Sequence, residues 1–271
     1  MMRREETLRP AVLVAALAEA VLGFALRLWQ LRQGRDENGL WLGGSASVLA
    51  LLAVCVIAIV AFWLLSRRAA PRAAYERNFA PGMGSGVGYV IGGVLLAVGG
   101  LSAAAMQVGF GRAIGLAALL PAAQLVWHGL CRARGRVPGL LAGCVVVAWL
   151  VARIIGDFKN WSTDPAVLDY CFQLFGLLCA MLGLFHAAGF SADRGKRRIT
   201  LFWSMAGVFF CGISLADGGL TACLTYGGLA AALLQNAICL TIPGDGDAEP
   251  ADDPRLDEQG FFQQTHLSLR G

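Results

Sequence analysis

Charged residues are scarce in this chain of 271 residues, where they make up 15% of the sequence. A soluble domain usually carries about 25% charged and about 45–50% apolar residues. Here the hydrophobic share is 57% and the mean hydropathy is +0.62. This composition excludes intrinsic disorder for most of the chain, since disorder needs low hydrophobicity. It also disfavours a single soluble globular domain and leaves a protein whose surroundings are largely lipid.

Signatures of catalysis and metal binding are also lacking. Neither H-E-x-x-H nor G-x-S-x-G occurs. The eight cysteines include no pair at C-x-x-C spacing, so we expect them to act as small buried apolar groups. His128 and His186 alone are a weak signal for a metal site. We therefore expect no enzymatic activity, no cofactor and no bound metal.

Long apolar runs are what the sequence has in abundance. Eight of them have about the 20 residues that a helix needs to cross a bilayer, and they alternate too little to be membrane β-strands. The sequence therefore predicts an all-α, polytopic bundle of about eight transmembrane helices. Seven is the alternative, because the boundary Asp217-Gly218-Gly219 is short. The runs are Pro10–Leu31, Leu40–Leu65, Val87–Val108, Arg112–Cys131, Pro138–Phe158, Pro165–Phe190, Thr200–Ala216 and Gly219–Ile242.

Basic residues are divided unevenly between the two sides of these runs. With the N-terminus inside, fourteen Lys or Arg residues lie in inner segments and four in outer loops. Cytoplasmic loops carry such an excess, so both termini are predicted to be cytoplasmic. Bases at the ends of apolar runs suit lipid headgroups, and we expect the bilayer, not nucleic acid, as the partner. The excess of twenty Arg over two Lys favours a bacterial source. The predicted location is therefore the cell membrane, namely a bacterial inner membrane.

The end of the chain differs from the rest. Residues 243–271 hold seven acids against two bases, which predicts an acidic, disordered cytoplasmic tail after a bundle formed by residues 1–242. A weak 4+4 repeat, 1–131 and 138–242, is a further hypothesis, because four spans restore the orientation of the chain. Small-xxx-small spacing at Gly84, Gly88 and Gly92 permits close helix contact. We expect this packing within the chain, with a homodimer as the alternative.

Ionisable residues inside a membrane are costly, so each is a candidate functional residue. Glu19 lies near the middle of the first run. Arg27, eight residues later, is expected to reach the outer headgroups by snorkelling. Amides and imidazoles in other runs would hydrogen-bond neighbouring helices or line a solute path. The candidate intramembrane polar site comprises Glu19, Gln124, His128, Gln173, His186, Gln235 and Asn236.

A second polar group lies toward the predicted outer ends of the fifth to seventh runs. Arg153 and Asp157 are i,i+4 neighbours on one helix face and can pair. With Asp169 and Asp217 they are interpreted as an acidic outer vestibule for a cation or an amine. The alternative is a set of solvated helix caps and one surface ion pair.

Two classes of function remain. The first is a small-solute or ion permease, favoured by Glu19 and by polar groups at both ends of the bundle. The second is a non-transporting sensor, or an assembly subunit that binds a membrane protein partner, favoured by the short loops and by a tail suited to docking. An intramembrane enzyme is disfavoured because no nucleophile with a neighbouring base is evident.

Overall fold

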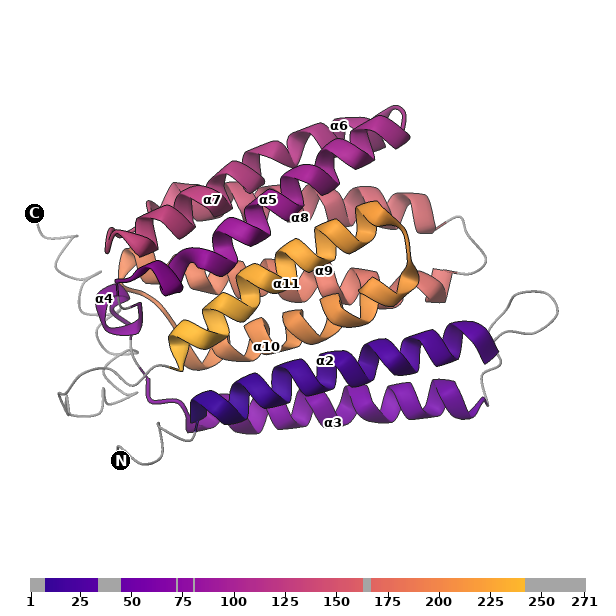
Figure 1. The fold of residues 1–271 in the computed structure, drawn as a ribbon, viewed down its shortest axis with the longest axis horizontal. Coiled ribbons are helices and arrows are strands. Elements are labelled where there is room, and N and C mark those ends of the chain that lie inside the picture. Colours follow the sequence, from indigo (N-terminus) through magenta and orange to yellow (C-terminus); the bar gives the residue numbers. More distant parts are fainter. Residues whose placement is uncertain (1–7, 34–44, 72, 80, 163–166, 242–271) are drawn as a thin grey trace, which may run out of the picture.

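The structure, a computed structural model, describes residues 8–33, 45–71, 73–79, 81–162 and 167–241. Within these ranges every regular element is a helix (Figure 1). The predicted acidic tail lies outside the described residues. Successive long helices run in opposite directions, so Leu8 and Leu240 lie at the same end of the bundle. We call this the terminal end, and the opposite one the far end.

Membrane-length helices follow the predicted apolar runs. Seven described segments are long and apolar enough to cross a membrane, and α8, with 22 residues, adds an eighth of similar length. A helix of 22 residues is about 33 Å long, which suits a hydrocarbon core of about 30 Å. The predicted all-α membrane bundle is therefore confirmed. The helices are α2 (Leu8–Gln33), α3 (Ala46–Arg68), α4 (Tyr75–Asn78), α5 (Met83–Met106), α6 (Phe110–Ala117), α7 (Leu119–Ala133), α8 (Leu140–Trp161), α9 (Cys171–Ala188), α10 (Arg197–Ser214) and α11 (Leu220–Leu240), with 3₁₀ turns η1 (Val167–Tyr170), η2 (Gly189–Ala192) and η3 (Leu215–Asp217).

The fourth predicted run is not one continuous helix. It is divided into α6 and α7 at Ala118. Pro121 has no N–H to donate to the carbonyl of Ala117, and its ring crowds that carbonyl. The turn before it is tightened instead, with Ala118 N donating to the oxygens of both Ile114 and Gly115.

Two other boundaries are set by local chemistry. α3 begins at Ala46 because Ser45 caps it, its Oγ accepting a hydrogen bond from Val48 N over 3.4 Å. The last two runs are separated by Gly218 and Gly219, whose φ angles of 86° and 85° suit glycine alone. This sharp turn favours eight spans over seven.

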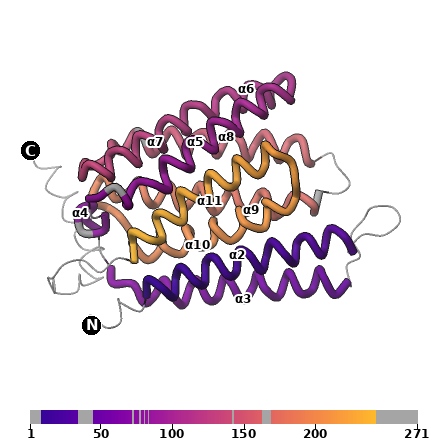
Figure 2. Tube along the Cα trace, in the orientation of Figure 1, coloured from indigo at the N-terminus to yellow at the C-terminus, as the bar shows by residue number. Residues whose placement is uncertain are grey.

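Six of these segments close into a ring. α10, α11, α5, α7, α8 and α9 each pack on the next, and α9 returns to α10. The α2–α3 hairpin lies outside the ring against α10, as the traces in Figures 1 and 2 show. α10 is consequently the most enclosed span, with 78% of its apolar window buried against 22% for α3. The exposed Leu, Val and Ile side chains of α3 suit contact with lipid.

α5 and α11 approach each other at the level of the backbone. A Cβ atom on Gly92 would lie 2.5 Å from the carbonyl oxygen of Gly228, and one on Gly228 would lie 2.7 Å from the oxygen of Gly92. Both distances are below ordinary van der Waals contact. The predicted packing of the glycine-rich helix within the chain is therefore confirmed at Gly88 and Gly92, whereas a Cβ atom on Gly84 would meet no atom within 4 Å. This packing brings Tyr89 of α5 beside Asn236 of α11.

Candidate functional site

A buried polar cluster occupies the terminal end of the ring, where α5, α7 and α11 meet. It comprises Tyr89 of α5, His128 and Arg132 of α7, and Asn236 of α11, which are between 0% and 8% exposed. The Tyr89 hydroxyl donates to Asn236 Oδ1 over 2.8 Å. Arg132 Nη2 donates to the same oxygen over 2.9 Å. We call these four residues the arginine cluster.

Two aromatic rings pack on the guanidinium of Arg132. Its Cζ atom lies 4.0 Å from the centre of the Phe79 ring and 4.3 Å from that of Tyr89. Such cation–π contacts contribute up to about 2 kcal/mol when they are shielded from water. Arg132 also lies in the last turn of α7, where the helix dipole favours a positive charge.

The short helix α4 closes the terminal end over this cluster. Its Tyr75 N–H donates to Asp193 Oδ1 over 3.2 Å, and the Phe79 ring packs edge-on against Phe190 at 5.3 Å. Burial raises the pKa of the Tyr75 hydroxyl above its ordinary value, although the neighbouring Arg132 opposes this shift. Tyr75 therefore stays a neutral phenol and does not neutralise the guanidinium.

Several polar atoms of the arginine cluster are buried without a hydrogen-bond partner. They are Nε and Nη1 of Arg132, Nδ2 of Asn236 and Nε2 of His128. Buried polar groups in native proteins are nearly always hydrogen-bonded, and leaving one unpaired typically costs about 1–3 kcal/mol. The concentration of four such atoms in one place sets this part of the structure apart from ordinary helix packing.

A buried ion pair joins the hairpin to the ring near the far end. Arg27 Nη2 lies 2.6 Å from Asp217 Oδ1, and the two side chains are 1% and 6% exposed. Gln173 Nε2 donates to Asp217 Oδ2 over 3.3 Å. The guanidinium also donates to Gln30 Oε1 over 3.0 Å and to the backbone oxygen of Asp169 over 2.8 Å.

The snorkelling predicted for Arg27 is wrong. Arg27 belongs to the stripe of α2 that includes Ala16 and Gly23 and is buried against the ring. A carboxylate 190 residues away in the sequence, Asp217, meets it there. The guanidinium is neutralised inside the protein and does not need to reach the headgroups. Nor is Asp217 a solvated helix cap, since its side chain is almost fully buried.

The predicted outer group is only partly brought together. Asp217, Gln173 and the backbone of Asp169 surround Arg27. Arg153 and Asp157 form the expected i,i+4 pair, with Nε 2.6 Å from Oδ2, on α8. An acidic vestibule that takes a cation stays a prediction. The observed arrangement is two ion pairs in which each acid faces an arginine.

Tyr226 lies on the buried side of α11, near residues of both ion pairs. Its side chain is 2% exposed, and its hydroxyl has no hydrogen-bond partner. The hydroxyl lies within electrostatic range of Asp157, Arg153 and Asp217, and the ring lies near Gly176 of α9. Tyr226 therefore points across the interior of the ring.

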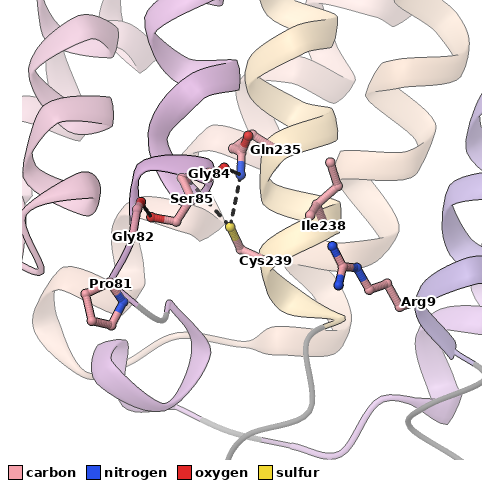
Figure 3. A pocket seen from close by; sticks show the side chains of 8 residues that line it. All are labelled: Arg9, Pro81, Gly82, Gly84, Ser85, Gln235, Ile238 and Cys239. Atoms are coloured by element: carbon pink, nitrogen blue, oxygen red, sulfur yellow. Dashed lines mark hydrogen bonds between the residues drawn. The ribbon is translucent and has the colours of Figure 1, made fainter.

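Gln235 faces away from the arginine cluster, although it adjoins Asn236 in the sequence. Its Nε2 donates to the oxygen of Gly84 over 3.0 Å, and its Oε1 accepts from Gly88 N over 3.0 Å. It lines a pocket of about 290 Å³ at the terminal end, between the start of α5, the end of α11 and the start of α2 (Figure 3). The lining residues are Arg9, Pro81, Gly82, Gly84, Ser85, Gln235, Ile238 and Cys239.

The other predicted residues lie apart from these clusters or at their edge. Gln124 is one turn before His128 on α7, and its Oε1 is buried without a partner. Glu19 continues the buried stripe of α2 but stays partly exposed, and it forms no hydrogen bond or ion pair among the described residues. His186 is half-buried against Phe185 on α9. A single site that gathers all the predicted residues is not observed.

Arg132 and Tyr89 were missed by the reasoning from sequence. Arg132 was assigned to an inner loop because it follows the end of an apolar run. A signal was present, since Gln124, His128 and Arg132 are spaced four residues apart and share one helix face. No sequence signal marks Tyr89, because a tyrosine in an apolar run resembles any buried aromatic residue.

Within the described ranges, no three His, Cys, Asp or Glu side chains gather as a metal site would require. In comparisons with known proteins, no family model, no curated protein and no solved structure matches the chain.

Proposed function

We propose that this multi-pass membrane protein is a permease for a small solute or ion, with a path through the six-helix ring. Ionisable residues are rare inside membranes and mark solute paths when they face a bundle interior. Here such residues occur at two depths. The arginine cluster lies toward the terminal end, and Tyr226 with Arg153 and Asp157 lies toward the far end.

The observation that carries this proposal is the inner face of α11. Tyr226, Leu229, Leu233 and Asn236 follow one another at helical spacing on this face. Tyr226 and Asn236 are about 15 Å apart along the axis, at 1.5 Å per residue. Leu229 and Leu233, both 0% exposed, fill the space between them. Two polar layers separated by an apolar barrier are expected of a closed permease.

The direction of the path follows from the distribution of charge. The terminal end carries the basic segments around Arg67, Arg134 and Arg198, which by the positive-inside rule supports a cytoplasmic position for this end. The far end would then face the outer side of the membrane. The membrane itself would be the cell membrane, of the bacterial inner-membrane type. No catalytic role is included in this proposal.

Flux measurements on the full chain in liposomes test the proposal. Small anions, cations and neutral solutes are each loaded, and their release is followed over time. We expect release of at least one class, and about tenfold slower release from Tyr226→Phe, which removes the buried hydroxyl that would hydrogen-bond the passing solute. Tyr170→Phe is the matched control, because Tyr170 stacks on Trp161 at the far end and should release the solute at the normal rate.

Two results would contradict the proposal. One is the absence of flux for every solute from protein that is monodisperse and resists heating. The other is equal flux from Tyr226→Phe and the unaltered chain. A stoichiometric protein partner retained in mild detergent, together with absent flux, would favour the sensor or assembly subunit instead.

A further inference from the structure

We propose that the arginine cluster is a binding site for a small monovalent anion, held by Arg132 and Asn236. The binding site stands on its own geometry, whereas the anion as transported solute rests on the permease proposed above. The site is assigned from the charge balance, from the direction of the hydrogen bonds and from the place of the cluster within the ring.

The charge balance around Arg132 is incomplete. A guanidinium stays protonated in proteins, and this one is 4% exposed. By contrast, Arg27, a buried arginine near the opposite end of the bundle, is neutralised by a carboxylate. Among the described residues, no Asp or Glu forms an ion pair with Arg132. Aromatic rings and the helix dipole offset part of the cost of burying its charge, and an anion would offset the rest.

The hydrogen bonds give the cluster a surplus of donors. Asn236 Oδ1 accepts from both the Tyr89 hydroxyl and Arg132 Nη2, and this fixes the orientation of the amide. Its Nδ2 group is left with two hydrogens and no acceptor. Arg132 Nε and Nη1 also have no acceptor within hydrogen-bond distance. The Tyr75 hydroxyl lies near the guanidinium, but its single oxygen cannot satisfy all of these donors. A ligand at this place must accept hydrogen bonds, which a cation cannot do.

An anion explains these facts better than water does. A buried water would accept a hydrogen bond but would donate two others, and it would leave the positive charge uncompensated. A small anion supplies acceptors and charge together. His128 Nε2 is a further polar atom at the edge of the site, where the neutral imidazole can donate or accept according to its tautomer. The close packing of Tyr89, Phe79 and Asn236 around the guanidinium favours anions of the size of chloride or nitrate.

Thermal unfolding of the full chain in detergent tests the site without requiring transport. The sodium salts of chloride, nitrate and gluconate are compared at one ionic strength, gluconate being too large for the site. We expect chloride or nitrate to raise Tm with a saturable dependence on concentration. Arg132→Gln should weaken this binding by about 30-fold or more, the effect of losing a buried charge partner. Arg134→Gln is the matched control, since Arg134 is exposed two residues later and should leave the dependence unchanged.

A second variant keeps the test decisive if Arg132→Gln fails to fold. Asn236→Asp places a carboxylate beside the guanidinium in a side chain of nearly the same shape. We expect it to raise Tm in gluconate and to remove the response to chloride and nitrate. An anion response that persists in Asn236→Asp, or its absence from the unaltered chain, would overturn the inference.

The two proposals fail in different ways. Saturable anion binding without flux would retain the site and contradict the permease. If a solute is transported and Arg132→Gln leaves its flux unchanged, the permease proposal stands and the anion as transported solute is contradicted.

Discussion

Arg27 and Asp217 hold the α2–α3 hairpin on the ring by a pair of buried charges. Neither side chain is more than 6% exposed, so each charge depends on the other for its solvation. Such pairs contribute modestly when intact, because desolvation offsets the attraction between the charges. Removing one member costs more stability than removing both, since loss of one member leaves the other charge buried and unpaired.

Breaking this pair from one side should be costly. Arg27→Met leaves the buried Asp217 carboxylate without its cationic partner and still in contact with the neutral amide of Gln173, and we expect the free energy of unfolding to fall by about 3–5 kcal/mol. The double variant Arg27→Met/Asp217→Leu should recover most of that loss, because both charges are absent. Thermal unfolding in detergent measures both changes. Equal destabilisation by the single and double variants would contradict a buried pair.

At the scale of single residues, the sequence predicted which polar residues matter better than it predicted which residues they contact. Gln173, Asp217, His128 and Asn236 were recognised as candidates because polar groups in apolar runs are rare. Arg27 was misjudged because its partner lies 190 residues away, and no periodic pattern connects α2 with η3. Which polar residues meet depends on the order of helices in the ring, and this order follows from three-dimensional packing.

Among the elements, α5 and α11 form a close helix pair, and Gly92 and Gly228 lie where their backbones meet. A methyl group on Gly228 would meet the backbone of Gly92, whereas a methyl group on the neighbouring Gly227 would have no atom of another residue within 4 Å. The two adjacent glycines of α11 thus differ in surroundings while sharing one helix. They offer a matched comparison of the contact itself.

Adding a methyl group at these two positions should have opposite effects. Gly228→Ala should lower the free energy of unfolding by about 1–3 kcal/mol, because the helices must separate. Gly227→Ala should leave it unchanged or raise it by up to about 1 kcal/mol through helix propensity. Thermal unfolding of both variants side by side gives the result. Similar losses in the two variants would argue against close contact between α5 and α11.

The helices themselves were largely predictable, whereas the details of their ends were not. Apolar runs of about 20 residues identified the spans because lipid leaves the backbone few alternatives to the helix. The division at Ala118 follows from Pro121, a signal that was present in the sequence but hidden by the surrounding apolar residues. The helix α4 is too short to be recognised from an apolar run, and its position depends on contacts with Asp193 and Phe190.

For the whole molecule, the even number of spans places both described chain ends at the terminal end. Charge then predicts which side of the membrane that end faces. The basic segments lie at the terminal end, while the far end includes the short turns at Gly109 and Gly218. The 4+4 repeat stays a prediction, as does the role of the acidic tail, which lies outside the described residues.

Reporter fusions check this orientation directly. Green fluorescent protein at the C-terminus should fluoresce in cells, because it matures in the cytoplasm. Alkaline phosphatase fused after Val108, at the far end, should be active, since it requires the outer side of the membrane. The same enzyme fused after Arg136, at the terminal end, should be inactive. Activity at Arg136 and not at Val108 would reverse the orientation.

The long separation between Arg27 and Asp217 also has a consequence for biogenesis. A ribosome adds about 5–20 residues per second, so Asp217 is made about 10–40 s after Arg27. During that interval the nascent first helix holds a guanidinium whose counterion does not yet exist. The newly inserted hairpin must therefore keep Arg27 near the headgroups, and the side chain moves into the protein only after α10 and η3 emerge. Docking of α2 and α3 on the ring is thus a late step of assembly, although both helices are synthesised before those of the ring.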